Sequence, residues 1–397
     1  MRLRSAVILF TLLGSAIGAA PAIANDPEAP TLVARAILPA DATAPAPFFS
    51  LPDQDPAPAP AATQWVGGFS ALIAGADENI FLAMPDNGFG NKANSRSFLL
   101  RVYRVKPQFE TARGGPGTVQ ILNWIGLRDP DRKIPFEIVN QNTPRRLLTG
   151  GDFDIESMRR APDGTLWFGD EFGPFLIHTD AAGKVLEAPI PLPDVKSPDF
   201  PGLAPGEENL ARSNGFEGMA LSKDGRFLYP ALEGPVTGDD PRVRRVYEFD
   251  LTTKRYNDPV RVYRVADPTF LVSDLTALDG NRMVALERDN FQGAEARHKK
   301  GFVVNLNRTG PNGALVKREV VDLLRLADPA KISLLARPGD IGIGDPFSMP
   351  YVTIEAVLPL GDERLAIVND TNFGSTGRNP GHPDYSDFIV VRVPELD

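Results

Sequence analysis

The chain has 397 residues, a formal net charge of −9 and no cysteine. The acidic balance argues against a nucleic-acid-binding protein, which needs a basic face. Without cysteine no disulfide can form, so packing, ring closure or a bound metal must stabilise the fold. Beyond the N-terminal segment, no stretch approaches the roughly 18 consecutive apolar residues that a membrane-spanning helix needs.

The first 24 residues have the organisation of a secretory signal peptide. Arg2 and Arg4 form a basic start, residues 6–20 are apolar, and residues 22–24 fit the small-residue cleavage pattern. We expect cleavage after Ala24 and a mature protein that is periplasmic or secreted.

Residues 25–64 precede the main domain, which we place at 65–397. Residues 31–38 alternate loosely between apolar and polar and predict a strand. Residues 39–62 are rich in proline and alanine, which is typical of an extended loop or linker.

From residue 67 onward, one strand–turn–strand unit recurs in five copies. In the central copy, residues 150–175, Glu156 lies in a short strand, a tight Asp-Gly turn follows, and an acidic box begins at Asp170. We call the position of Glu156 the slot. The slots of the five copies are Ser70, Glu156, Glu217, Thr276 and Glu355. The boxes begin at Asp86, Asp170, Glu233, Asp289 and Asp370, always 13 to 16 residues after the slot.

Short strands with glycine-rich turns at regular spacing predict an all-β fold, and the repeat predicts a single β-propeller. The copies start 58 to 86 residues apart, so the larger gaps leave room for eroded blades. We therefore expect six or seven blades with long loops between them. The strand at 31–38 is expected to pair with the last strand, near 387–393, and close the ring. The one helix that we expect covers residues 320–327, before Pro329.

Several stretches resemble a known family. They are GGFSAL at 67–72, MPDNGFGNKANS at 84–95, FLLRVYRVKP at 98–107, GGDFDIES at 150–157, WFGDEFGPFL at 167–176, NGFEGMAL at 214–221 and VNDTNFG at 368–374. This set is similar to the secreted phytase-like propeller family, described as having esterase-like activity. The resemblance implies a propeller, calcium dependence and hydrolysis of a phosphate or carboxylate ester. The ligands of true propeller phytases do not align with this chain, so no ligand is taken from the family.

Equivalent positions of successive blades converge near the axis of a propeller, so repeated carboxylates are expected to meet there. The candidate metal ligands are Asp86, Glu156, Asp170, Glu171, Glu217, Glu233, Glu287, Asp289, Glu355 and Asp370. Ca²⁺, which takes six to eight oxygen ligands, would relieve their mutual repulsion. In the alternative reading, each acid only caps a turn within its own blade.

A phosphate substrate also needs cations, and Arg288 lies between two candidate ligands in the sequence. The other basic groups are Arg145, Arg146, Arg242, Arg244, Arg245 and the run 297–300, which we interpret as surface charge. The three histidines have no metal-binding spacing, and there is no G-x-S-x-G motif for a serine nucleophile. The phenylalanines beside slots and boxes are interpreted as packing between blades.

These features predict an exported, calcium-dependent hydrolase of phosphate esters or other esters. A metal-activated water would attack, with Glu156 and Glu217 as catalytic carboxylates and Arg288 as the charge clamp. We expect a monomer that acts on a small molecule. Two alternatives stay open: a non-catalytic propeller that binds a ligand or partner and keeps a structural cation, and a lactonase-like propeller.

Overall fold

The computed structural model describes residues 29–45, 63–334, 336–394 and 396. The predicted signal peptide and most of the proline- and alanine-rich segment lie outside the described residues. The described part contains strands β1–β23 and two short 3-10 helices, η1 (Gly293–Glu295) and η2 (Ile332–Leu334). Among these residues, no helix has the length and apolar character required to cross a membrane.

Most strands form five four-stranded antiparallel units, the blades, of which blades 1 and 5 are joined into one nine-stranded sheet through a pairing between one strand of each. Blade 1 contains β4 (Ala71–Ala74), β5 (Phe81–Met84), β6 (Arg101–Gln108) and β8 (Thr118–Gly126). Blade 2 contains β9 (Ile155–Arg160), β10 (Leu166–Asp170), β11 (Phe175–Thr179) and β12 (Ile190–Pro191). Blade 3 contains β13 (Phe216–Leu221), β14 (Phe227–Leu232), β15 (Val243–Asp250) and β16 (Arg255–Arg264).

The remaining blades complete the ring. Blade 4 contains β17 (Leu271–Ala277), β18 (Arg282–Arg288), β19 (Lys299–Thr309) and β20 (Leu315–Asp322). Blade 5 contains β21 (Ile354–Gly361), β22 (Arg364–Asn369), β23 (Ser386–Arg392) and β1 (Thr31–Leu38). The short strands β2 (Thr43–Pro45) and β3 (Thr63–Trp65) pair with each other, and β7 (Glu110–Thr111) pairs with β1.

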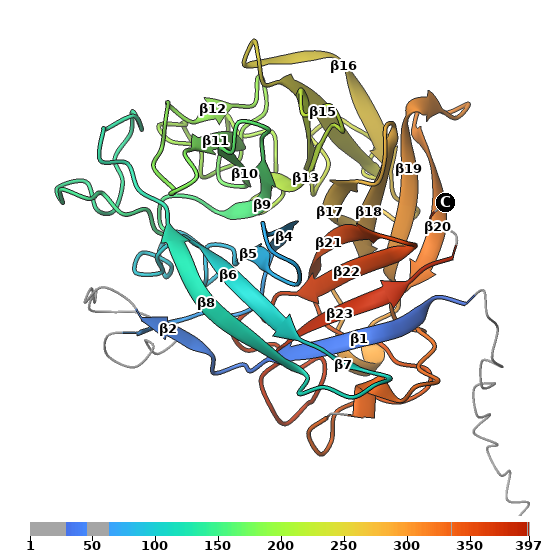
Figure 1. The fold of residues 1–397 in the computed structure, drawn as a ribbon. Coiled ribbons are helices and arrows are strands. Elements are labelled where there is room, and N and C mark those ends of the chain that lie inside the picture. Colours follow the sequence, from blue (N-terminus) through green and yellow to red (C-terminus); the bar gives the residue numbers. More distant parts are fainter. Residues whose placement is uncertain (1–28, 46–62, 335, 395, 397) are drawn as a thin grey trace, which may run out of the picture.

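The innermost strands of the five blades surround a common axis (Figure 1). Along the ring, β4 contacts β9, β9 contacts β13, β13 contacts β17, β17 contacts β21, and β21 returns to β4. The all-β propeller is therefore confirmed, whereas the expected six or seven blades are not. The ring of described strands closes on five blades, because the long gaps between copies hold loops, chiefly 127–154 and 323–353, rather than further sheets.

Hydrophobic side chains fill the spaces between neighbouring blades. Leu82 and Leu100 of the first blade region, for example, belong to the same buried cluster as Ile155, Phe168 and Ile177 of blade 2. All five residues of β10 are buried, since adjacent blades cover both faces of its sheet. Full burial of this kind explains why strands such as β10 (LWFGD) and β5 (FLAM) are short, mostly apolar runs rather than strict alternations.

The predicted closure of the ring is confirmed. Strand β1 lies antiparallel to β23 and completes blade 5 with a strand from the other end of the chain (Figure 1). At their boundary, Arg35 Nε donates to Asp387 Oδ1 at 2.7 Å, and both side chains are almost completely buried. Asp387 Oδ2 also accepts from Arg378 Nη2 at 2.9 Å and from the Tyr351 hydroxyl at 2.6 Å.

The expected helix at residues 320–327 is wrong. Its first residues instead end strand β20, which pairs along β19 in an antiparallel register. Val320 and Val321 are buried in the cluster between blades 4 and 5. A short apolar run reads equally well as a buried strand and as a helical turn, and here pairing with β19 decides the outcome.

We predict that Asp387→Asn destabilises the protein, because two buried arginines then lose the charge that offsets theirs. The free energy of unfolding in a urea titration should fall by about 3–5 kcal/mol, the range for breaking a buried ion pair. Arg364→Ala is the control, because Arg364 on neighbouring β22 pairs with Asp362 at the surface; its effect should stay within about 1 kcal/mol. Equal effects of the two substitutions would contradict a stabilising role of the closure network.

Candidate functional site

A β-bulge at the start of the inner strand positions the slot residue. In β9, Ile155 pairs with Asp170 and Ser157 with Gly169, so Glu156 is the extra residue. The same break in register isolates Glu217 in β13 and Glu355 in β21. A bulge turns one side chain away from the regular alternation of the strand, and here it does so for the three slot glutamates.

In the fourth copy the bulge lies at a different residue from the predicted slot, Thr276. In β17, Val272 pairs with Glu287 and Asp274 with Leu286, so the extra residue is Ser273 and not Thr276. Ser273 precedes Asp289 by 16 residues, the same separation as in the first and third copies. The slots are therefore Ser70, Glu156, Glu217, Ser273 and Glu355, three glutamates and two serines.

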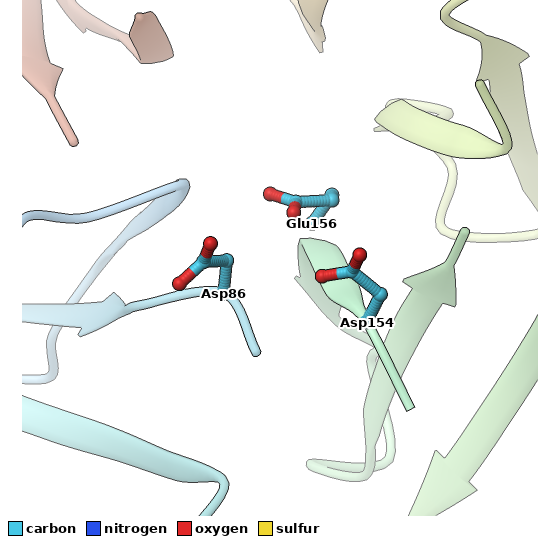
Figure 2. Close-up of side chains that lie close together, drawn as sticks. All are labelled: Asp86, Asp154 and Glu156. Atoms are coloured by element: carbon cyan, nitrogen blue, oxygen red, sulfur yellow. The ribbon is translucent and has the colours of Figure 1, made fainter. Parts of the chain in front are cut away.

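The carboxylates form two close groups that share one residue. Asp86, Asp154 and Glu156 each offer an oxygen within 4.8 Å of the others, and so do Glu156, Glu171 and Glu217. Figure 2 shows the first group, in which the loop after β5 brings Asp86 opposite the two acids at the start of β9. Glu156 therefore links both groups.

Asp154 was missed by the sequence analysis. It lies two residues before the slot, inside the stretch GGDFDIES at 150–157. No other copy has an acid at this position, since Gly68, Gly215, Leu271 and Thr353 stand there. The repeat therefore held no signal for it, and only its two-residue spacing from Glu156 could have suggested a shared site.

Several oxygens of these groups are buried without a hydrogen-bond partner. They are Asp154 Oδ1, Glu156 Oε2 and Glu171 Oε1. Their residues are 3%, 8% and 3% exposed. Buried carboxylate oxygens are normally hydrogen-bonded or paired with a cation. Moving a carboxylate out of water without such a partner costs several kcal/mol. A cation, or protons shared between neighbouring carboxylates, would supply the missing partners.

One arginine among the described residues faces this acidic group. Arg288 Nη2 lies 2.8 Å from Glu233 Oε1 and 3.9 Å from Glu355 Oε1, and all three side chains are buried. Burial works against the charge of Arg288, but Glu233, Glu355 and Glu217 outweigh it and raise its pKa. Ser70, the slot residue of blade 1, donates its hydroxyl to Glu355 Oε2 at 3.0 Å.

Burial and mutual repulsion raise the pKa values of the acids. Burial, followed by the charge of Asp170, raises the pKa of Asp154 to about 7, and burial with the charge of Asp370 raises that of Glu355 to about 8. Burial and neighbouring carboxylates also hold the pKa values of Glu156, Glu171 and Glu217 well above their ordinary range. Arg288 alone therefore does not neutralise the cluster.

Two box acids shape the rim of the site through backbone hydrogen bonds. Asp170 accepts from the backbone N–H groups of Asp154 and Gly173, both at 2.8 Å. Asp370 accepts from the N–H of Gly68 at 3.1 Å. Asp170 thus lies beside Asp154 of the first close group, and burial together with the charge of Asp370 raises the pKa of Asp86 in the same group. The hydrogen bonds of these two acids fix the loops that carry them.

Two of the predicted metal ligands form ion pairs with lysines outside the two close carboxylate groups. Asp289 lies 2.9 Å from Lys299 Nζ and accepts from the N–H of His298 at 2.9 Å. Glu287 binds Lys317 and the Tyr263 hydroxyl, and it lies 3.1 Å from His298 Nε2. Neither belongs to the two close groups of the described residues.

A further buried ion pair joins the inner strands of different blades. Arg159 of β9 donates to Asp274 of β17 at 3.2 Å and to the Leu275 carbonyl at 2.9 Å. Asp274 in turn accepts from the N–H of Val357 in β21 at 2.9 Å. Blades 2, 4 and 5 are thus joined across the ring, which fixes the strands whose first residues carry Glu156 and Glu355.

Comparison with known proteins identifies the family of this chain. Residues 64–373 match the family model Phytase-like, described as esterase-like activity of phytase. The chain belongs to the phytase-like family. A relative named an uncharacterized secreted protein, from Arthroderma benhamiae, is 27% identical over 315 residues, covering 59% of this chain and 61% of the relative. The match thus spans less than two thirds of the length of that relative.

Solved structures show a much weaker likeness to this phytase-like protein. A luciferin-regenerating enzyme has 12% identity and a TM-score of 0.35, covering 81% of this chain and 76% of its own. A streptogramin B lyase has 10% identity and a TM-score of 0.31, covering 87% and 72%. Similarity at this level is too low to assign a fold or a function. The fold assignment therefore rests on the arrangement of the blades.

We predict that, in chelator, the phytase-like protein loses stability as the pH rises. Asp154 and Glu355 titrate at about 7 and about 8 in the folded state, against ordinary values of 3.8 and 4.5. The folded state therefore holds protons that the unfolded chain has released, so the Tm should fall steadily from about pH 5 to about pH 8. Added calcium should reduce this fall. A Tm that stays level over this range and does not respond to calcium would contradict the charge balance described here.

We also predict that Glu156→Gln weakens calcium binding by about tenfold or more, because ligand charge sets the affinity of such sites. In chelator at pH 8 the same variant should melt above the wild type, because one repelling charge is gone. Isothermal titration calorimetry and thermal melting measure the two effects. Glu319→Gln serves as control, since Glu319 is a half-exposed acid of β20 paired with Lys300. If both variants bind calcium like the wild type, Glu156 is not a ligand.

Proposed function

We propose that this phytase-like protein is an exported, calcium-dependent hydrolase of phosphate esters or other esters. The observation that carries the proposal is Glu156, which belongs to both carboxylate groups and keeps one buried oxygen without a partner. Family membership supports ester chemistry, and the secreted relative supports export to the periplasm or beyond. We further propose that it acts as a monomer on a small molecule and binds no nucleic acid.

The residues fit a hard cation. All members of the two close groups offer carboxylate oxygens, the donors that Ca²⁺ prefers, and no histidine or cysteine takes part. We assign the cation to the two groups, Asp86, Asp154, Glu156, Glu171 and Glu217. When bound, calcium would polarise a phosphoryl or carbonyl oxygen and lower the pKa of a water molecule.

The remaining work is done by side chains of this chain. Arg288 can bind the negative oxygens of the substrate, because its guanidinium is held by Glu233 while its Nε has no hydrogen-bond partner. Glu217, a buried carboxylate of the second close group, would accept the proton of the attacking water. Glu156, between Glu217 and Asp154, positions the reacting groups.

The near-complete burial of two of these glutamates favours the non-catalytic alternative. Glu156 and Glu217 are only 8% and 4% exposed, which also suits a cation that serves only to hold neighbouring blades together. The protein would then bind a ligand or a partner without catalysis. A lactonase-like propeller differs from the first proposal only in its substrate, because a lactone is also an ester.

We predict that purified protein with calcium hydrolyses at least one of nitrophenyl phosphate, bis-nitrophenyl phosphate, nitrophenyl acetate and a lactone panel, and that chelator abolishes the turnover. Glu217→Gln should lower kcat by about 10²-fold or more through loss of the base. Arg288→Gln should lower kcat by about 10²–10³-fold through loss of charge stabilisation.

Glu319→Gln is again the control and should keep the wild-type rate. Turnover of lactones alone would select the lactonase-like reading. No turnover on any substrate, together with a calcium-dependent rise in Tm, would overturn the hydrolase proposal and favour the binding propeller.

A further inference from the structure

A groove of about 700 Å³ lies beside blade 1, outside the carboxylate site. Its lining residues lie at the start of β6, at the end of β8 and in the segment that follows β8. Figure 1 shows β6 and β8 side by side. We call this cavity the arginine groove. Its lining includes Arg101, Arg128, Arg145, Trp124, Leu99 and Leu147.

Backbone hydrogen bonds make the base of the arginine groove rigid. Leu127 N donates to Leu100 O at 3.0 Å, Leu148 N to Leu127 O at 2.9 Å, and Leu100 N to Leu148 O at 3.0 Å. The backbone N–H and C=O groups of three chain segments thus pair with one another. The side chains that line the groove are therefore held on fixed backbone and do not depend on a free loop.

The groove carries three positive charges and no acid among its lining residues. A purely positive groove is unusual on a chain whose net charge is −9. No ion pair joins any of these three arginines to a described carboxylate. Arg101 Nη1 donates to Pro45 O at 3.0 Å, and Arg128 Nη1 donates to Gly126 O at 3.2 Å.

Arg101 is the central group. It is only 1% exposed, and its Nη2 makes no hydrogen bond of ordinary geometry, although the buried Tyr103 hydroxyl lies close enough for the charge of Arg101 to act on the pKa of that tyrosine. A buried guanidinium without a counter-ion is costly, which points to an anion that supplies the missing charge. Arg101 is also held in place, because its guanidinium carbon lies 4.9 Å from the centre of the Trp124 ring.

The groove also offers an apolar surface. Trp124 keeps 36% of its surface exposed, which is rare among the large hydrophobic side chains described. Leu99, Leu147 and Pro45 line the groove beside it. A ligand that only brought charge would leave this surface in water, whereas a flat apolar ring would cover it.

We propose that the arginine groove binds an organic anion that carries a flat, apolar ring, such as an aromatic carboxylate. The anionic group pairs with Arg101 and Arg145, and the ring lies against Trp124 and the leucines. This site is independent of the carboxylate cluster and of calcium. Its ligand is bound and not cleaved, because no carboxylate or nucleophile lines the groove.

The test uses 1-naphthoate as probe, which contains no ester and so cannot be a substrate of the proposed hydrolase. Calorimetry on the full chain in chelator should show one saturable site, with quenching of tryptophan fluorescence. The neutral 1-naphthamide and the small anion acetate should each bind about tenfold more weakly or less. Loss of hydrolase activity would not alter these results.

Two exposed positions make the test decisive even if Arg101→Met fails to fold. Arg145→Ala should weaken 1-naphthoate binding about tenfold through loss of charge, and Trp124→Leu should weaken it and remove the quenching. Arg255→Ala, an exposed arginine of β16, is the matched control and should bind like the wild type. Absence of saturable binding, equal binding of 1-naphthamide, or unchanged affinity in Arg145→Ala and Trp124→Leu would overturn the proposal.

Discussion

Ring closure brings the first residues of five inner strands to one axis, and in this chain three of the slot residues are glutamates. Two like charges about 4 Å apart repel by roughly 4 kcal/mol at an effective dielectric constant of about 20. The two close groups contain five acids, and Arg288 already pairs with Glu233. Protons or a divalent cation must supply the rest of the compensation, and this requirement underlies both the raised pKa values and the proposed function.

Other parts of the fold hold the repelling groups in place. The pairing of β1 with β23, with Arg35 and Asp387 buried between them, prevents the ring from opening between the chain ends. The contact between Arg159 and Asp274 crosses the ring, and the bonds that Asp170 and Asp370 accept from backbone N–H groups fix the box loops. Packing energy and these buried pairs thus offset the repulsion concentrated at the axis.

Much of this arrangement was predictable, because repetition in the sequence becomes symmetry in space. Glu156, Glu217 and Glu355 were identified from their spacing alone, and so was the pairing of residues 31–38 with the last strand. The number of blades was not predictable, because a long gap between copies does not reveal whether it folds into strands or loops. Ser273 was misplaced by three residues, since a bulge residue that is not acidic leaves no mark in the fourth copy.

The residues that sequence reasoning missed or placed differently depend on contacts outside the repeat. Asp154 belongs to one blade only, so no second copy pointed to it. Glu287 meets Tyr263 of β16 and Lys317 of β20, and Asp289 meets Lys299 of β19. Such partners follow from strand register within blade 4 and from its packing against blade 3, which spacing alone does not determine.

The most direct test of a shared cation is a crystal structure of the protein soaked with calcium or a lanthanide, located by anomalous scattering. The account predicts an ion within about 2.3–2.6 Å of a Glu156 oxygen, with further oxygens from the other acids of the two groups. An ion bound only elsewhere, with the Glu156 carboxylate protonated and hydrogen-bonded to a neighbouring acid, would contradict it.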